Sequence, residues 1–276
     1  MSEKKLPDPE NNLLDYNREA WNRQVREKNE WTIPVTPADI ASARQGDWKI
    51  VLTPQKPVPH DWFPDFQTDQ FRVLCLAGSG GQQAPILAAA GAEVTVFDLS
   101  PSQLTQDQMV AQREGLEIET IQGDMRDLSA LADDTFDLIV HPCSNGFVPD
   151  ILPVWREAAR VLKPGGDLIS GFIKPVFFIF DFEEMEKGTL DVAHSIPFSD
   201  LTSISAEQRK AYIESGEPLC FGHSLTDQIG GQIAAGLNIT GYYEDIWPGY
   251  VISNYIKAFA ATKATKPVKP SSSNHL

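Results

Sequence analysis

Short apolar runs alternate with helix-like segments over most of the chain, from residue 71 onward. Each run has the length and the Val, Ile, Leu and Phe content of a buried strand. The segments between the runs are long enough to return the chain to the start of the next strand, so neighbouring strands are expected to run parallel. This pattern predicts a doubly wound α/β fold with strands at residues 71–76, 93–97, 117–121, 136–140, 167–172, 238–246 and 254–262, and helices at 82–90, 101–114, 149–162 and 224–236.

The flanking segments differ in composition from this alternating region. We expect a helix at residues 12–28, a second helix begun by Thr36 and Pro37, and an extended proline-rich strap over 54–64. Both ends are polar and rich in proline, which predicts disorder. The predicted parts are a disordered N-terminus (1–10), a cap extension (11–70), the main domain (71–263) with an insertion inside it (174–222), and a disordered tail (264–276).

The charge of the chain limits its partners. The sequence has 38 acidic and 23 Lys or Arg residues among 276, a formal net charge of −15. Such a surface repels nucleic acid phosphates and anionic lipids, so neither is an expected partner. The three cysteines lack the spacing of a zinc site or a disulfide framework, and the longest apolar run is too short to cross a membrane. We expect a cytoplasmic protein without a metal site; its oligomeric state stays open.

A glycine-rich turn follows the first predicted strand. Its residues are Gly78-Ser79-Gly80-Gly81, and Asp98 ends the second strand twenty residues after Gly78. Glycines at such a turn let the backbone approach a ligand, and the following helix N-terminus favours negative charge. An acid at the end of the second strand is placed to bind ribose hydroxyls. These residues alone fit either a nicotinamide dinucleotide or S-adenosylmethionine.

Four pieces of the chain together resemble the class I, Rossmann-like S-adenosylmethionine-dependent methyltransferases of the small-molecule type. In sequence order they are VLCLAGSGGQQAPILAAAGAEVTVFDLSPSQL, QGDMR, FDLIVH and EAARVLKPGG. The resemblance covers about residues 71–173. It implies a mostly parallel seven-stranded sheet whose last strand is antiparallel, an N-terminal helical cap over the cofactor, and a lid inserted after strand five.

The resemblance also assigns cofactor-binding roles by position. Asp98 would accept both ribose hydroxyls, Leu99 would flank the adenine, and His141 would lie near the transferring methyl group. The full set of expected cofactor-binding residues is Tyr16, Trp21, Ala77, Gly78, Gly80, Asp98, Leu99, Gln103, Asp124, Met125, His141 and Pro142. Two positions depart from the family pattern: Cys75 stands where the family usually has an acid, and Ala77 stands in place of a motif glycine. The departures leave open which group holds the ammonium of the cofactor.

The expected activity is methyl transfer to an O, N, S or C atom of a small molecule. Holding the acceptor in line with the methyl group supplies about 7–11 kcal/mol without a catalytic side chain. His141 is the expected catalytic candidate, and Cys143, His194, His223, Tyr243 and Asp245 are weaker ones. A non-catalytic S-adenosylmethionine-binding protein and a nicotinamide-dependent oxidoreductase remain alternatives. Phenylalanines of the insertion, Phe177, Phe178, Phe180 and Phe182, are expected to keep water out of the acceptor pocket.

Overall fold

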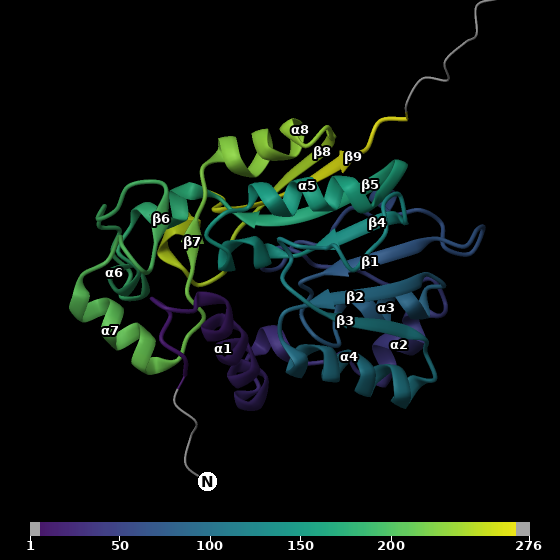
Figure 1. The fold of residues 1–276 in the computed structure, drawn as a ribbon, viewed down its shortest axis with the longest axis horizontal. Coiled ribbons are helices and arrows are strands. Elements are labelled where there is room, and N and C mark those ends of the chain that lie inside the picture. Colours follow the sequence, from purple (N-terminus) through teal and green to yellow (C-terminus); the bar gives the residue numbers. More distant parts are fainter. Residues whose placement is uncertain (1–5, 269–276) are drawn as a thin grey trace, which may run out of the picture.

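A seven-stranded sheet forms the centre of the computed structural model, which describes residues 6–268 (Figure 1). The strands lie in the order β3-β2-β1-β4-β5-β9-β8, and their bounds are Arg72–Leu76 (β1), Glu93–Asp98 (β2), Ile118–Gln122 (β3), Phe136–His141 (β4), Leu162–Ile173 (β5), Asn238–Asp245 (β8) and Phe259–Thr265 (β9). Strands β1 to β5 pair in parallel, whereas β9 is antiparallel to both β5 and β8. The predicted fold class is confirmed.

Helices cover both faces of the sheet because successive strand residues point to opposite sides. Val73 and Val94 pack with α2 and α3, whereas Leu74 and Ile139 pack with α5 on the other face. The α-helices are α1 (Leu13–Glu27), α2 (Pro37–Ala43), α3 (Gln83–Ala89), α4 (Pro101–Glu114), α5 (Leu152–Val161), α6 (Phe182–Glu186), α7 (Ala206–Ser215) and α8 (Gly231–Ala234). Short 3₁₀ turns span Glu30–Thr32, His60–Trp62, Cys143–Phe147, Pro175–Ile179 and Val251–Asn254, and a π turn spans Thr226–Gly230.

The C-terminal strand lies later than the sequence predicts. A 3₁₀ turn occupies Val251–Asn254, and β9 begins only at Phe259 because Tyr255 and Ile256 are exposed and cannot supply a buried strand. The same strand continues to Thr265, so the first two residues of the predicted tail belong to the sheet. At the other end, Leu6 packs on the cluster around Tyr16 and Leu219. Residues 1–5 and 269–276 lie outside the described part of the chain.

The N-terminal extension contacts the α/β domain at three places. Helix α1 lies beside α4, where the Asn22 side-chain oxygen accepts hydrogen bonds from Ser100 Oγ (2.7 Å) and from the amide of Ser102 (3.2 Å). Helix α2 instead packs against α3 on one sheet face. The segment 50–56, called the strap from here on, then crosses the carboxyl edge of the sheet; it shares only residues 54–56 with the proline-rich segment predicted at 54–64. It lies so close to Gly171 of β5 that a Cβ there would be 2.2 Å from the Leu52 carbonyl oxygen.

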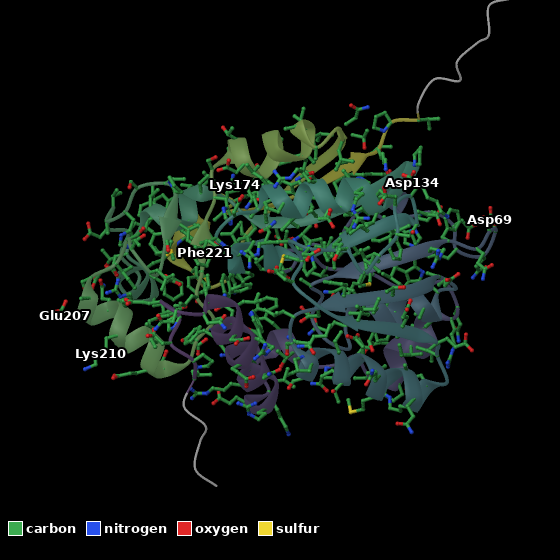
Figure 2. All side chains as sticks on the ribbon, viewed as in Figure 1. Asp69, Asp134, Lys174, Glu207, Lys210 and Phe221 are labelled. Carbon is green, nitrogen blue, oxygen red and sulfur yellow. The ribbon has the colours of Figure 1, made fainter. Side chains whose placement is uncertain are left out.

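The insertion forms a separate small body beside α1. It carries α6, α7 and a two-stranded sheet of β6 (Phe198–Ser199) and β7 (Phe221–Gly222), seen at the left of Figure 1. Figure 2 shows Glu207 and Lys210 projecting outward from α7, while Phe221 on β7 is 4 % exposed. The body joins α1 through Asn17, whose amide nitrogen donates to the Leu219 carbonyl (3.2 Å) and whose oxygen accepts from the Leu219 amide (2.9 Å).

Side chains hold the glycine-rich turn from behind. The amides of Ser79, Gly80 and Gly81 donate to Gln83 Oε1 (3.1 Å), Gln103 Oε1 (2.9 Å) and Asp107 Oδ1 (2.7 Å), respectively. Gln103 and Asp107 lie one turn apart on α4, so both reach the same loop. Ala77 opens this turn with a φ of 48°, in the left-handed region that favours glycine.

We expect Gly171→Ala to lower the free energy of unfolding by about 1–3 kcal/mol, because the added Cβ would overlap the backbone of Leu52 and force the strap to shift. Urea denaturation measures the change. Gly230→Ala is the matched control, since its Cβ would lie 3.7 Å from the nearest atom and its φ is −62°. Equal stability of Gly171→Ala and the parent protein would show that the strap is not pinned there.

Asp107 gives a pH-dependent prediction for the ligand-free protein. Burial raises its pKa from 3.8 to about 8; the Gly81 amide acts against this, and nearby Asp98 adds to the rise. The native state therefore holds a proton that the unfolded chain releases above about pH 4. The stabilisation that comes from holding this proton is fully present below the pKa of Asp107 in the unfolded chain. As the pH rises from there toward 8, the free energy of unfolding falls by up to about 1.4 kcal/mol per pH unit.

Asp107→Asn keeps an oxygen for Gly81 but cannot ionise. We expect the difference in free energy of unfolding, variant minus parent protein, to be larger at pH 8 than at pH 5. Urea denaturation of both proteins at both pH values measures it. A stability difference that is the same at both pH values contradicts the assignment.

Candidate functional site

A cavity of about 240 Å³ lies at the carboxyl edge of the sheet. It reaches from the ends of β1 and β2 to the ends of β5 and β9, with α1 and the strap forming part of its wall. Ligands of open α/β sheets bind at this edge. The described residues that line it are Leu13, Leu14, Asn17, Trp21, Trp31, 51–54, Ala77, Gly78, Ser79, Gln82, Gln83, 97–99, Gln103, 123–126, Pro142, Cys143, Ser144, 147–149, Ile173, Trp247 and Phe259.

One end of the cavity carries acidic side chains. Asp98, at the end of β2, is 8 % exposed, and its Oδ1 accepts a hydrogen bond from the Ser100 amide at 2.7 Å. Burial raises its pKa from 3.8 to about 7, against a smaller lowering by that amide. Asp124 lies in the same wall and is bound through both oxygens by the Arg126 guanidinium. Among the described lining residues, Asp98 is therefore the carboxylate without a cationic partner.

Nine of the twelve residues expected to bind the cofactor line this one cavity. They are Trp21, Ala77, Gly78, Asp98, Leu99, Gln103, Asp124, Met125 and Pro142. Gly80 does not line it, because its amide faces Gln103 and a Cβ there would lie 2.3 Å from the Gln103 carbonyl oxygen. The turn amides of residues 79–81 thus contact side chains of the protein.

Two further residues lie elsewhere than the sequence predicts. His141 is the last residue of β4, and its side chain points into the face covered by α5, with 0 % exposure and Nδ1 2.8 Å from the Leu76 carbonyl oxygen. Burial lowers its pKa to about 4, so it is neutral and sealed from the cavity. Tyr16 is also fully buried, and its hydroxyl donates to the Glu217 carbonyl at 3.0 Å. Both placements correct the expected contacts with the cofactor.

The other end of the cavity is apolar and aromatic. Trp31 meets Trp247 with ring centroids 5.9 Å apart, and Trp21 meets Phe147 at 4.9 Å. The phenylalanines of the insertion do not line this space, which corrects their predicted place. Phe177 instead packs behind the lining residues Trp247 and Phe259, at 6.3 and 5.7 Å, and Phe182 is 41 % exposed.

Sequence reasoning missed the strap and the late aromatic residues of this wall. Trp31, Trp247 and Phe259 belong to no motif, and each is brought to the site by tertiary packing alone. The proline-rich composition of residues 54–64 was the one signal available, but that predicted segment includes only Pro54 of the wall residues. It did not indicate which residues face a ligand.

The remaining candidate bases are poorly placed or poorly ionised. The Cys143 thiol lines the cavity, but burial raises its pKa and it donates to the Leu52 carbonyl. His194 packs on Phe198, and His223 contacts the Asn145 carbonyl. Within residues 6–268 no group of three His, Cys, Asp or Glu side chains is arranged to hold a metal ion, and no helix is long and apolar enough to cross a bilayer.

Comparisons with known proteins agree with this arrangement. Residues 74–170 match a family described as a methyltransferase domain. The chain is 52% identical over 256 residues to the uncharacterized methyltransferase YbaJ of Bacillus subtilis (strain 168), covering 93% of this chain and 99% of the relative. It is 37% identical over 102 residues to a ubiquinone biosynthesis O-methyltransferase of Xanthomonas oryzae pv. oryzae (strain PXO99A), covering 35% of this chain and 41% of that protein.

A solved structure gives the same fold. The S-adenosylmethionine-dependent methyltransferase from Mesorhizobium loti superposes with a TM-score of 0.56 and 17% identity, covering 74% of this chain and 94% of that one. The long match to YbaJ and the strand order favour a methyltransferase over a nicotinamide-dependent oxidoreductase. The chain belongs to the methyltransferases, and its fold is that of the class I, S-adenosylmethionine-dependent type.

Proposed function

We propose that the protein methylates a small, largely apolar or aromatic molecule bound between Trp31, Trp247 and Phe259. The observation that carries this proposal is that one cavity joins the acidic end around Asp98 to an aromatic end with little polar surface. Its volume of about 240 Å³ lies just below the range of about 300–1,000 Å³ that is usual for ligand sites.

The cofactor would lie along the glycine-rich turn. In this placement Asp98 accepts the ribose hydroxyls, Leu99 and Met125 contact the adenine, and Asp124 lies at its amino edge. The methionine part would pass Ala77, Gly78 and Pro142 toward the aromatic end. The placement is supported by these residues sharing one cavity wall. Because the chain carries 38 acidic against 23 Lys or Arg residues, we further propose that it acts in the cytoplasm without nucleic acid or membrane partners.

The residues of the site bind and orient rather than transfer protons. S-adenosylmethionine, when bound, supplies a methyl group attached to a sulfonium. The neutral thioether that remains after methyl transfer is a good leaving group. The ionisable side chains in the wall are Asp98, Asp124, Arg126 and Cys143; the first three lie at the nucleoside end and the buried thiol stays protonated. Aromatic rings that fix the acceptor in line and exclude water would account for the rate, since positioning alone supplies about 7–11 kcal/mol.

The acceptor class is tested with methyl-labelled S-adenosylmethionine and a cell extract separated by molecular mass. We expect label in the low-mass fraction only, and at least tenfold less label with Trp247→Leu, because acceptor contacts are lost while S-adenosylhomocysteine affinity changes less than about twofold. Trp48→Leu is the control, since Trp48 packs on Phe63 and Phe66 away from the cavity. Label in protein or nucleic acid rules out the small-molecule proposal.

Asp98 predicts a pH dependence of cofactor binding. The ionised carboxylate accepts ribose hydroxyls more strongly than the protonated form, and its pKa of about 7 places the change near neutrality. We therefore expect S-adenosylhomocysteine to bind more weakly at pH 6 than at pH 8 in calorimetric titrations. Asp98→Asn should bind at least tenfold more weakly at pH 8 and lose the pH dependence, whereas the exposed Asp69→Asn should match the parent protein (Figure 2). An unchanged pH profile in Asp98→Asn assigns the titration to another group.

A further inference from the structure

The usual acid of the first strand is absent, and the residue in its place cannot act as one. Cys75 is 1 % exposed within the apolar cluster that joins β1 to α2 and α3. Burial, with a smaller contribution from Asp107, raises the pKa of its thiol far above the ordinary value, so the group stays neutral. The positive ammonium of the methionine part must therefore find its acceptor elsewhere.

The carboxylates in the cavity wall do not meet this need. Asp98 and Asp124 are the acidic residues among the described lining residues, and both lie at the nucleoside end. Arg126 already neutralises Asp124, with nitrogen–oxygen distances of 2.6 and 2.9 Å. A negative group near the opposite end must act from behind the wall.

Asp245 lies behind the wall and touches a residue that lines it. Thr53 Oγ1 donates to Asp245 Oδ2 at 2.8 Å, and the amides of Gln55 and Lys56 donate to the same oxygen at 2.9 and 2.8 Å. The Ile246 amide occupies the other oxygen at 2.8 Å. Burial alone would raise the pKa of Asp245, but these hydrogen bonds outweigh it and lower the pKa, so the carboxylate is ionised.

The direction of this hydrogen bond fixes what Thr53 can offer to a ligand. Its single hydroxyl proton is directed to Asp245, so a ligand that reaches this oxygen from the cavity meets lone pairs, and the carboxylate increases the negative charge of the oxygen. Ser144 behaves alike, because its hydroxyl donates to the Ala77 carbonyl. Toward a ligand, these two hydroxyl oxygens can therefore only accept, which suits a cationic donor better than an anion.

The strap sets Thr53 beside the methionine part of the proposed cofactor site. Gln83 links the strap to the glycine-rich turn, accepting from the Ser79 amide at 3.1 Å and donating to the Val51 carbonyl at 3.4 Å. Cys143 links the strap to the end of β4 by donating to the Leu52 carbonyl at 3.2 Å. Thr53 is the next residue along the strap, on the side of Asp245 at the end of β8, and it lines the same cavity as Ala77, Gly78 and Pro142.

We propose that Thr53, polarised by Asp245, accepts a hydrogen bond from the ammonium of S-adenosylmethionine and takes over the role of the missing first-strand acid. The proposal rests on the cofactor placement proposed above. Asp245 is a positioning residue in it, since it contacts Thr53 and the strap rather than the ligand. The competing explanation is that Asp245 only fastens the strap to β8.

Three ligands separate these explanations in calorimetric titrations of the full chain. S-adenosylhomocysteine has the ammonium, its deaminated analogue keeps the carboxylate without the nitrogen, and 5′-methylthioadenosine has only the nucleoside and a methylthio group. For Thr53→Val we expect about tenfold or greater loss of S-adenosylhomocysteine affinity, the size expected for a lost hydrogen bond to a charged group. The affinities for the other two ligands should change less than about twofold. Thr53→Ser should restore binding.

Thr240→Val is the matched control, because it removes an exposed threonine hydroxyl from β8, the strand that ends in Asp245. An equal loss for S-adenosylhomocysteine and the deaminated analogue in Thr53→Val would overturn the proposal in favour of a purely structural strap. Unchanged affinity for all three ligands would overturn it as well. If the parent protein did not bind 5′-methylthioadenosine, the cofactor placement itself would fail, which is distinguishable from a failure confined to Thr53.

Discussion

The close approach of the strap to β5 is the contact on which the rest of the site depends. Gly171 has no side chain, so the Leu52 carbonyl can lie against the carboxyl edge of the sheet. That contact, together with the hydrogen bonds to Asp245, carries residues 51–54 into the cavity wall. The strap closes a side of the cavity that the sheet and its helices would leave open. An N-terminal segment thereby becomes part of a site otherwise built from the α/β domain.

The fold was predictable because its signals are local and repeated. Apolar strands, Pro101 at the start of α4 and Gly115 after it are each recognisable within a few residues, and Ser100 caps α4 by accepting from the Gln103 amide at 3.2 Å. Asp98, Leu99 and Met125 were predictable for a similar reason, since they follow strands whose order the motifs give. The aromatic wall was not predictable, because Trp31 and Trp247 meet across 216 positions of sequence and neither has a motif.

His141 shows how a correct strand can still give a wrong side chain. Position at the carboxyl end of β4 suggests a place in the site, but side chains alternate along a strand. Val140 faces the cluster with α2 and α3, so His141 faces α5 and meets Trp155, with ring centroids 6.0 Å apart. The alternation of side chains therefore directs His141 away from the cavity. The residues after it, Pro142, Cys143 and Ser144, line the cavity instead.

The buried acids on either side of the glycine-rich turn connect stability with ligand binding. Asp107 holds the Gly81 amide from behind and Asp98 faces the cavity, and burial raises the pKa of both toward or above neutrality. Ionising either one in the ligand-free protein is therefore unfavourable. A ribose whose two hydroxyl groups donate hydrogen bonds to Asp98 would favour the ionised form of this carboxyl group and lower its pKa. Cofactor binding would then release a proton near neutral pH, and part of its free energy would offset the desolvation of this carboxylate.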